Sequence, residues 1–354
     1  MIIGIGKRLP VAIDMNIASN PEDIEKKIVL ILKILNEAQE PTGSRLIARK
    51  MQEGGVILSE RTVRYHLKLM DERGITSLVG RQDGRIITEM GLEELTNARV
   101  RDKVGLAISR IEVLAFKTTF DPQKRRGLLP ANVSLYQKED FARALEVMEA
   151  AFRQRLFVSE LVAVIEEGNR IGEILVPPGK IALATVCSIV VNGVLLKNGI
   201  PMDSKFGGIL QMRHGKPLRF TELIHYSGTS LDPSEIFIRG RMTSVRKMIE
   251  QGEGNILANF REIPAPSRNL VDKLILNLRR AGIEGVLSIG EISEPICQIP
   301  VDVNKIGMIL IGGLNPVALA QEAGIEADNH AMSTMVDYND LQNFSYFLEK
   351  TAAK

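Results

Sequence analysis

Apolar residues between positions 21 and 73 recur every three or four positions, which predicts three successive helices. The first starts at Pro21, because a missing N–H is harmless at the first helical position. The second covers 44–53, and Gly54-Gly55 is expected to end it with left-handed residues. The third follows Ser59, a suitable N-cap. The residues predicted to face inward are Ile24, Ile28, Ile31, Leu35, Leu46, Ile47, Met51, Val63, Leu67 and Met70.

After the third helix, short β-like runs predict a hairpin. Gly74 is expected to end the helix, and 76–80 and 85–88 are expected to pair around Asp83-Gly84, which suits a tight turn. Helix, turn, helix and hairpin in this order are the pattern of a winged helix-turn-helix. The sequence therefore predicts such a domain at about 22–95, preceded by an N-terminal extension, 1–21, to which no role is assigned.

The third helix has a polar face that suits DNA. Its basic and aromatic residues lie opposite the apolar stripe, and two arginines flank the hairpin tip. Residues 41–88 carry nine Lys and Arg against five Asp and Glu, on a chain whose formal net charge is only +2. We therefore predict major-groove binding to double-stranded DNA, while an ordinary solvated helix face, or a winged helix that binds RNA or protein, stays open. The DNA-contacting candidates are Ser59, Arg61, Thr62, Arg64, Tyr65, Lys68, Arg81 and Arg85.

From about residue 98 the pattern changes to alternating strands and helices, which predicts a larger α/β domain at 98–354. Segments 192–200 and 315–325 each follow an apolar strand and share an asparagine, an apolar helix and a Gly-Ile pair. This makes an internal duplication a candidate beside chance similarity. Strands are expected at 113–120 and 128–135, as a hairpin, and at 161–165, 171–176 and 181–191. Helices are expected at 90–103, 139–155, 194–197, 242–250, 270–280 and 317–323.

The composition is that of a globular protein, with 354 residues of which 45% are hydrophobic and 25% charged. The small net charge argues against a general nucleic-acid coat or a membrane-surface binder. No apolar run reaches the roughly 18 to 20 residues needed to cross a bilayer, so no membrane partner is expected. Cys187 and Cys297 give neither a disulfide framework nor a metal-ligand spacing, which fits a cytoplasmic protein.

Common catalytic motifs are missing from the sequence. It has no G-x-S-x-G elbow, no H-E-x-x-H pair and no G-x-x-x-x-G-K-[ST] loop, and the histidines are scattered at His66, His214, His225 and His330. We therefore predict a protein that is not an enzyme, without catalytic residues, metal or cofactor. A metabolic enzyme acting on a small oxo acid and fused to a DNA-binding domain is the alternative, and a protein-binding scaffold is another.

Several long segments resemble the NrpR family, the nitrogen-regulation repressors of methanogenic archaea. The resemblance runs from about 22 to 345 and is carried by PTGSRLIARKMQEGGVILSERTVRYHLKLMDERGIT, TVCSIVVNGVLLKNGIPMDSKFGGILQ, SGTSLDPSEIFI, GNILANFREIPA and GMILIGGLNPVALAQEAGI. It implies a transcriptional repressor of nitrogen-assimilation genes that is released from its operator by 2-oxoglutarate, in a homodimer or higher oligomer. Some family members carry two tandem effector domains and this chain has room for one, which leaves open whether it acts alone or with a second repressor subunit.

A site for 2-oxoglutarate must hold two carboxylates and a keto oxygen, so it needs N–H donors, hydroxyls, amides and a cation. Glycine-rich turns supply candidates, above all 311–316, where a strand ends and a helix opens at Pro316. These turns also fit a purely structural role, with glycines needed for backbone geometry and core hydroxyls bonded to backbone. The effector-binding candidates are Thr185, Ser188, Asn192, Lys205, Gly207, Gly208, Thr229, Ser230, Gly312, Gly313 and Asn315.

Overall fold

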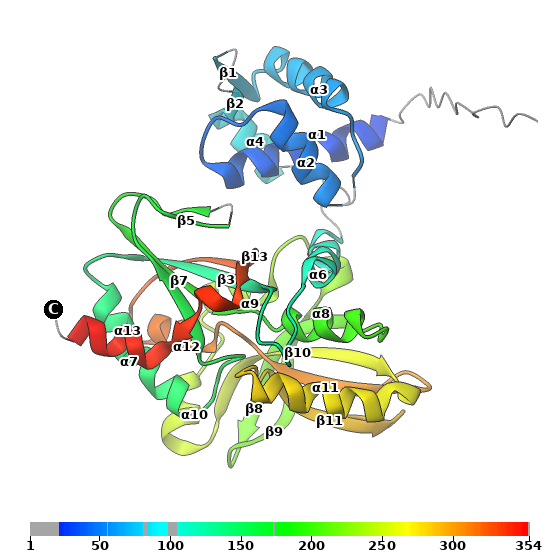
Figure 1. Cartoon of the computed structure of the whole chain (residues 1–354), viewed down its shortest axis with the longest axis vertical. Helices are drawn as coiled ribbons and strands as arrows, with labels where there is room; N and C mark the ends of the chain where they lie inside the picture. The colour runs from blue at the N-terminus through cyan, green and yellow to red at the C-terminus, as the bar shows by residue number, and fades with distance from the viewer. Residues whose placement is uncertain (1–20, 55, 81–83, 98–104, 173, 353–354) are drawn as a thin grey trace, which may run out of the picture.

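The computed structural model describes residues 21–54, 56–80, 84–97, 105–172 and 174–352. Its N-terminal part is a winged helix-turn-helix, and its larger part contains two five-stranded sheets surrounded by helices (Figure 1). Each part has its own cluster of buried apolar side chains. The chain is thus an α/β protein with two hydrophobic cores, as its sequence predicts.

The winged helix contains the three helices and the pair of strands that its sequence predicts, while the hairpin tip at 81–83 and the end of the predicted helix 90–103, after 97, lie outside the described residues. Ser59 caps the recognition helix by accepting a hydrogen bond from the Thr62 N–H at 3.1 Å. The predicted left-handed ending of the second helix is wrong at Gly54, which has φ −84° and closes the helix by bonding to Lys50 O. Gly55 lies outside the described residues. The elements are α1 (Pro21–Ala38), α2 (Ser44–Glu53), α3 (Glu60–Glu72), β1 (Thr76–Gly80), β2 (Gly84–Ile87) and α4 (Glu89–Asn97).

The wing is fastened to the body of this domain by its second strand. Thr42 and Arg85 exchange two backbone hydrogen bonds, at 2.9 and 3.1 Å. Gly84 has φ +100°, and a side chain there would come within 2.4 Å of the Thr42 carbonyl carbon. This position therefore requires glycine, both for its backbone conformation and for the close approach.

The larger domain begins with α6 (Leu106–Lys117), and its elements alternate along the chain. The first half contains β3 (Leu128–Gln137), α7 (Phe141–Arg153), β4 (Leu161–Ile165), β5 (Arg170–Ile171), β6 (Ile174–Leu175), β7 (Lys180–Val186), α8 (Ile189–Lys197), β8 (Asp203–Arg213) and β9 (Lys216–His225). Then come η1 (Tyr226–Gly228), α9 (Pro233–Arg239) and α10 (Val245–Gln251). The second half contains β10 (Gly254–Pro264), η2 (Ala265–Ser267), α11 (Arg268–Arg280), β11 (Val286–Ile292), β12 (Lys305–Ile311), α12 (Asn315–Glu322), β13 (Asp328–Asp337), η3 (Tyr338–Asp340), β14 (Gln342–Asn343) and α13 (Phe344–Ala352).

Four strands of each sheet repeat one topology, and the fifth strand differs, because β14 pairs with β4 whereas β9 pairs with β8. One has the order β13-β3-β7-β4-β14 and the other β11-β12-β10-β8-β9, so that β3, β4 and β7 correspond to β10, β11 and β12. Each half also contributes one strand to the sheet of the other half. Strand β8 of the first half pairs with β10, and β13 of the second half pairs with β3. This arrangement supports the internal duplication that the sequence suggests.

Matching backbone hydrogen bonds define which residues of the two halves correspond. Cys187 N–H donates to Pro130 O at 2.9 Å, and Gly312 N–H donates to Leu257 O at 2.8 Å. Because 187 corresponds to 312, residue 192 corresponds to 317. The predicted pairing of the two segments, which matched 192 with 315, is therefore displaced by two residues.

Three predicted strands of this domain differ from the structure. Segment 113–120 lies mostly in α6, whose buried Ala107, Ile111, Leu114 and Ala115 follow a helical period. Segment 181–191 is a strand only to Val186, and α8 follows it. Helix α8 is buried all round from 189 to 195, so its uniformly apolar sequence does not reveal a helical period. Segment 171–176 forms parts of the short β5–β6 hairpin.

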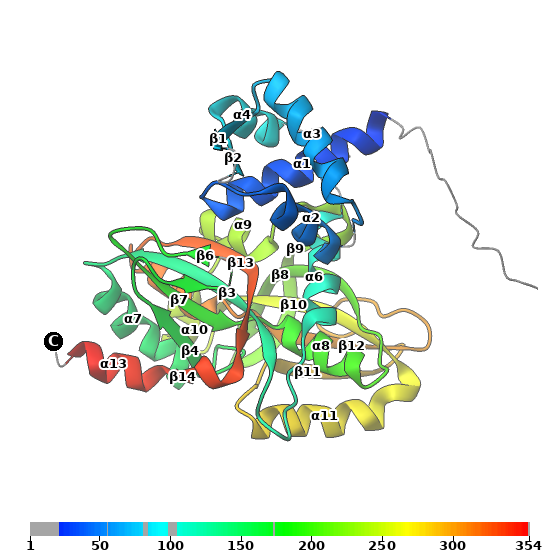
Figure 2. The ribbon, with the colours of Figure 1, turned by 45° about the horizontal axis from the view of Figure 1, so that its top comes forward.

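The winged helix lies on one side of the larger domain, next to α6, in both Figure 1 and Figure 2. Ion pairs connect α6 to it, with Arg110 Nη2 3.4 Å from Glu37 Oε1 and Lys117 Nζ 3.0 Å from Glu53 Oε2. None of the helices in the described ranges is long and apolar enough to cross a membrane.

Candidate DNA-binding surface and ligand pocket

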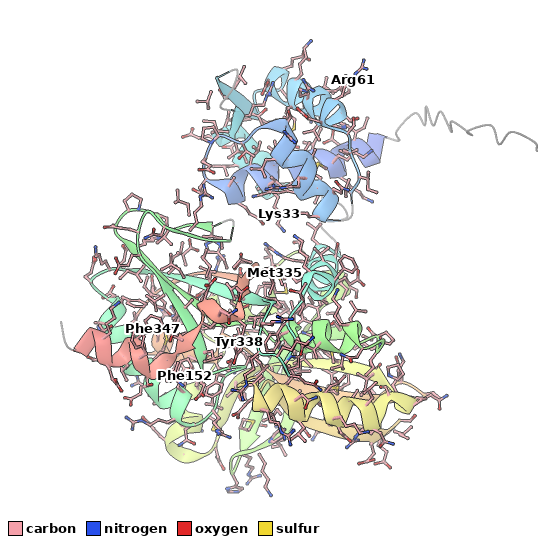
Figure 3. The ribbon with its side chains drawn as sticks, in the orientation of Figure 1. Lys33, Arg61, Phe152, Met335, Tyr338 and Phe347 are labelled. Atoms are coloured by element: carbon pink, nitrogen blue, oxygen red, sulfur yellow. The ribbon has the colours of Figure 1, made fainter. Side chains whose placement is uncertain are left out.

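The recognition helix α3 exposes its basic face on the side of the winged helix that points away from the larger domain, where Figure 3 shows Arg61. Tyr65 is 61% exposed. Among the described residues, Arg64 and Lys68 make long contacts with glutamates one turn away, at 3.5 and 3.8 Å. Such exposed pairs contribute little to stability, so both cations can turn to a phosphate or a base.

Three other DNA-contacting candidates have different positions. Ser59 and Thr62 are joined by a 2.8 Å hydrogen bond between their hydroxyls at the start of α3, where they cap the helix. The Arg85 Nε lies 2.7 Å from Asp71 Oδ2, which ties the wing to α3. Arg85 is therefore placed to position the wing, and Arg81 lies outside the described residues.

The larger domain has a pocket where its two halves meet, at the ends of β7 and β12. Corresponding residues of both halves line it, namely Asn132 with Asn259, Ser188 with Gly313, and Ile189 with Leu314. Its free volume of about 20 Å³ is enough for about one water molecule. The other lining residues are Cys187, Tyr226, Asp232, Ser234, Arg261 and Met332.

Arg261 is the most unusual residue of this pocket. It is 1% exposed, and its guanidinium donates to hydroxyls only, to Ser204 and, at 3.5 Å, to Ser188. Its Nε has no hydrogen-bond partner, and none of the described carboxylates forms an ion pair with it. Burial lowers the pKa of Arg261, but a guanidinium stays charged in proteins. The pocket therefore holds a buried positive charge that forms no ion pair with the described carboxylates, although the negative charge of Asp232, which lines the same pocket, raises the pKa of Arg261.

The corresponding place in the other half of the domain is neutral. There the Ser134 hydroxyl, which matches Arg261 in the sheet, donates to Asn329 Oδ1 at 2.6 Å. The two halves thus line the pocket with corresponding residues, but they differ in charge. Arg261 gives one side of the pocket its positive charge.

Amide and hydroxyl groups around Arg261 form one network. The Tyr226 hydroxyl donates to Asn259 Oδ1 at 2.5 Å, and Asn259 Nδ2 donates to Ser188 Oγ at 3.2 Å. Asp232 caps α9 by accepting from the N–H groups of Ser234 and Glu235, and burial raises the pKa of Asp232. A guanidinium with neutral donors nearby is suited to a small anion.

Both parts of the chain match known protein families. The NrpR regulatory domains NRD1 and 2 match residues 104–343, and the ribonuclease R winged-helix domain matches residues 29–95. The global nitrogen regulator NrpRI of Methanosarcina mazei is 40% identical over 319 residues, which are 90% of this chain and 98% of that protein. The chain belongs to the NrpR family.

Other NrpR relatives agree with this assignment. The global nitrogen regulator NrpR of Methanococcus maripaludis is 32% identical over 314 residues, which are 89% of this chain but 54% of that protein. The chain thus spans about half the length of this longer relative. The crystal structure of a nitrogen repressor-like protein from Methanococcus jannaschii matches with a TM-score of 0.57 and 27% identity, covering 68% of this chain and 98% of that one.

Two of the residues predicted to bind the effector of this NrpR chain, Ser188 and Gly313, line the pocket. Three other candidates, Asn192, Thr185 and Gly207, lie behind the residues that line the pocket. Asn192 Nδ2 donates to Ser204 Oγ, Asn132 Nδ2 donates to Thr185 Oγ1, and a side chain at Gly207 would come within 3.1 Å of the Tyr226 hydroxyl. These residues support the pocket without lining it.

The remaining candidates have structural surroundings. Asn315 binds the backbone of Leu257 through both its oxygen and its nitrogen. Gly312 packs against Leu257, and Gly208 packs against Phe220. Thr229 bonds to the backbone of Leu231 in the loop that also holds Ser230. We therefore leave these five residues out of the proposed ligand site.

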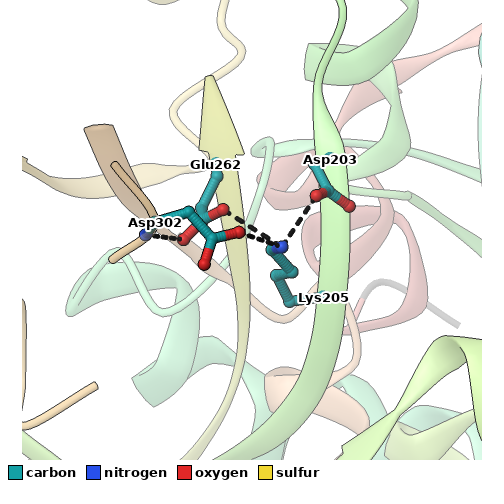
Figure 4. Close-up of polar contacts among 4 residues, drawn as sticks. All are labelled: Asp203, Lys205, Glu262 and Asp302. Atoms are coloured by element: carbon teal, nitrogen blue, oxygen red, sulfur yellow. Dashed lines mark hydrogen bonds and ion pairs between the residues drawn. The ribbon is translucent and has the colours of Figure 1, made fainter. Parts of the chain in front are cut away.

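Lys205, the predicted cation of the site, lies elsewhere (Figure 4). Its Nζ is within 2.8 to 3.2 Å of carboxylate oxygens of Asp203, Glu262 and Asp302. Burial lowers the pKa of Lys205, but hydrogen bonds to the three carboxylates outweigh burial and raise it. The ammonium occupies the position that a metal ion would need among these acids, so we assign neither a metal nor an effector to this cluster.

A larger cavity, of about 350 Å³, lies between the β8–β9 hairpin and α10. Its basic side chains Arg213, Arg219 and Lys247 are exposed, and Arg213 pairs with Glu253 at 3.8 Å. It lacks the buried unpaired charge that distinguishes the smaller pocket, so its size alone assigns it no ligand.

Five residues that line the pocket were not predicted from the sequence, namely Arg261, Asp232, Tyr226, Asn132 and Asn259. One signal was present, because Arg261 follows Ile256, Leu257, Ala258 and Phe260 in a strand-like run that reads as core. A charged residue inside such a run is buried only when something compensates it. The sequence pattern does not show which segments surround Arg261, because distant parts of the chain meet there only in the folded protein.

Proposed function

We propose that this NrpR protein is a transcriptional repressor of nitrogen-assimilation genes, that α3 binds its operator, and that 2-oxoglutarate in the Arg261 pocket weakens this binding. Its relatives are named global nitrogen regulators, which supports the nitrogen-regulating role. The exposed basic face of α3 supports DNA as the partner.

The unpaired guanidinium of Arg261 is the observation that carries the ligand assignment. A carboxylate is the natural partner for it, because a charge-assisted hydrogen bond would satisfy the free Nε and offset the cost of burying the cation. Asn132, Asn259 and Ser188 supply polar groups for the rest of a small oxo acid. The pocket must widen to admit it, because the free volume is about 20 Å³.

Release from DNA requires that 2-oxoglutarate bind the DNA-free conformation more tightly than the DNA-bound one. A tenfold loss of operator affinity corresponds to about 1.4 kcal/mol of coupling free energy. Operator DNA must then weaken 2-oxoglutarate binding by the same factor, which gives a second, independent measurement.

Calorimetry tests the ligand, with glutarate as a control that lacks the keto oxygen and pyruvate as one that lacks the second carboxylate. Operator titrations with and without 2-oxoglutarate then test release. We expect heat of binding for 2-oxoglutarate, weaker binding of both controls, and a lower operator affinity when ligand is present. No heat at millimolar 2-oxoglutarate, or equal operator affinity with and without it, would refute the proposal.

We also propose that the protein binds a pseudo-palindromic operator as a homodimer, because one winged helix contacts few base pairs. Light scattering of the protein with and without operator DNA measures the stoichiometry. Monomers that bind one per operator would contradict this.

The same pocket is less suited to enzymatic turnover. Burial raises the pKa of the Cys187 thiol to about 12, so at neutral pH it stays protonated and is a poor nucleophile. Conversion of a 2-oxo acid by the purified protein would favour an enzyme instead.

A further inference from the structure

Strand β13 is the least firmly held of the three strands that line the Arg261 pocket. It contributes Met332 and lies at the edge of its sheet. By contrast, the strands that contribute Asn132 and Arg261 each pair with another strand on both sides. The pocket has a free volume of about 20 Å³, so a small oxo acid must displace part of its wall, and an edge strand is easier to displace than a central one.

The pairing of β13 with β3 is interrupted at residues 331–333, which together face Asn132. We call these three residues the β13 bulge. Its middle residue, Met332, is buried and has φ +50°, in the left-handed region that a methionine rarely adopts. Its N–H donates to Asn132 Oδ1 at 3.1 Å, and the buried Ser333 hydroxyl has no hydrogen-bond partner among the described residues. Such a conformation persists only while its surroundings hold it, so the β13 bulge is suited to switch between two arrangements.

Directly after the β13 bulge, Thr334 contacts the β5–β6 hairpin. Gly172, in the turn of this hairpin, has φ +55°, and a side chain there would overlap Thr334 Oγ1 and come within 3.2 Å of Thr334 Cβ. The backbone of the hairpin therefore packs directly on β13, and glycine is required for this approach. The hairpin lies between the sheet that contains β13 and the winged helix in both Figure 1 and Figure 2.

The β5–β6 hairpin also holds the winged helix. Arg170 Nη2, in β5, lies 2.5 Å from Glu40 Oε1, and β6 lies beside α1. The Glu40 carbonyl accepts a hydrogen bond from the Thr42 hydroxyl at 3.0 Å, and Thr42 exchanges two backbone hydrogen bonds with Arg85 of the wing. A continuous series of contacts therefore joins Met332 in the pocket to the wing.

The ion pairs of Glu37 and Glu53 with α6 are a different kind of attachment. Helix α6 touches β13 as well, but it is also packed against α8, β3 and η1, which hold it in place. The hairpin consists of two strands of two residues each, and these two strands pair only with each other within the described ranges. Of the two attachments, the hairpin is therefore the one that can follow a movement of β13.

We propose that the β13 bulge is the gate of the pocket, and that the β5–β6 hairpin carries its movement to the winged helix. Entry of the ligand moves Met332 out of the pocket and frees the Asn132 amide for the ligand. Thr334 then shifts the hairpin away from Glu40, which changes the orientation of the wing and weakens DNA binding. This inference rests on the proposed ligand response, and it identifies the structure as the closed state that binds DNA.

Two substitutions in the full-length protein test the gate. Met332→Ala and Met332→Gly both remove the side chain from the pocket, but only glycine adopts φ +50° without strain. If the β13 bulge leaves this conformation when the pocket opens, glycine favours the closed state relative to alanine. We expect Met332→Gly to bind 2-oxoglutarate about threefold more weakly than Met332→Ala in calorimetry. Without ligand, hydrogen exchange in the β5–β6 hairpin should be slower in Met332→Gly. Equal exchange in the hairpin of the two variants would overturn the gate.

A second pair of variants tests the hairpin as the connection. Glu40→Gln is compared with Glu37→Gln, because the two side chains are 43% and 44% exposed and each pairs with an arginine of the larger domain. If 2-oxoglutarate lowers wild-type operator affinity about tenfold, Glu40→Gln should reduce that factor to about threefold or less. Glu37→Gln should leave it at about tenfold. Both variants should bind 2-oxoglutarate as tightly as the wild type, because neither residue lines the pocket.

Wild-type coupling in Glu40→Gln, or an equal loss of coupling in both variants, would overturn the hairpin as the connection. Weaker 2-oxoglutarate binding by Glu40→Gln would also overturn it, because it would show a structural role. Failure of the proposed function looks different. If the wild type gives no heat with 2-oxoglutarate while hairpin exchange still differs between Met332→Ala and Met332→Gly, the gate stands and 2-oxoglutarate is rejected as its ligand.

Discussion

The winged helix and the larger domain both use positive charge, but they hold it in opposite ways. On α3 the cations are exposed, with Arg64 and Lys68 at 62% and 76% side-chain exposure. In the pocket the single cation, Arg261, is 1% exposed. Exposed charges are hydrated, cost little to maintain and suit a long polyanion. A buried charge is costly to maintain and selects a small anion that fits the space.

The largest expected effect concerns the buried charge. Arg261→Met should weaken 2-oxoglutarate binding at least 100-fold, which is about 2.7 kcal/mol, because the carboxylate loses its partner. The free energy of unfolding should stay the same or increase, since an unpaired buried charge is replaced by an apolar side chain. Calorimetry and thermal unfolding measure the two effects. Arg246→Met, at an exposed arginine, is the control, and equal ligand affinity in both variants would refute the pocket assignment.

The exposed charges of α3 provide the opposite test. Arg64→Ala should lower operator affinity by about 1 to 3 kcal/mol if Arg64 contacts a base, and leave 2-oxoglutarate binding unchanged. Arg49→Ala is a matched control on α2, because Arg49 has the same 62% exposure and a similar ion pair one turn away. A fluorescence titration with operator DNA in which both variants behave alike would place the recognition surface elsewhere.

Lys205 allows a test of a charge that belongs to neither site. Lys205→Met should leave both ligand and operator binding unchanged, but should lower the free energy of unfolding at pH 7 by about 1 to 2 kcal/mol. The folded-state pKa of Lys205 is raised and that of Asp302 is lowered, so their stabilising contribution is present between the ordinary pKa values of a carboxylate and a lysine. It is lost as the pH falls through the folded pKa of Asp302. Urea unfolding at pH 7 and pH 3 should therefore show a smaller difference at pH 3.

The smallest expected effect is at Arg85, which is basic but tied to Asp71. Arg85→Ala should cost about 1 kcal/mol of stability, because it breaks a half-buried ion pair that holds the wing to α3. Operator affinity should fall less than in Arg64→Ala. A larger loss of affinity than at Arg64 would show that Arg85 contacts DNA directly.

The two regions also differ in how far the sequence predicted them. The winged helix is built from consecutive elements with local signals, and α2 begins and ends at the predicted residues 44 and 53. Its polar face could be predicted because one helix carries it. The pocket collects residues from positions as distant as Asn132, Ser188, Arg261 and Met332. Helical or strand periodicity gives the face on which a residue lies but not which distant segments it meets, so only Ser188 and Gly313 were anticipated.

The exchange of strands between the two halves has a consequence for how the protein is made. One edge of the first sheet is formed by β13, whose pairing with β3 joins residues as far apart as Leu128 and Asp337. Contacts over such distances form late, because a long loop of chain must close first. During translation the winged helix, which has its own hydrophobic core, is therefore complete long before Met332 can join the pocket. A nascent or truncated chain that stops before β13 would therefore contain the winged helix but lack Met332 and the strand that covers the pocket.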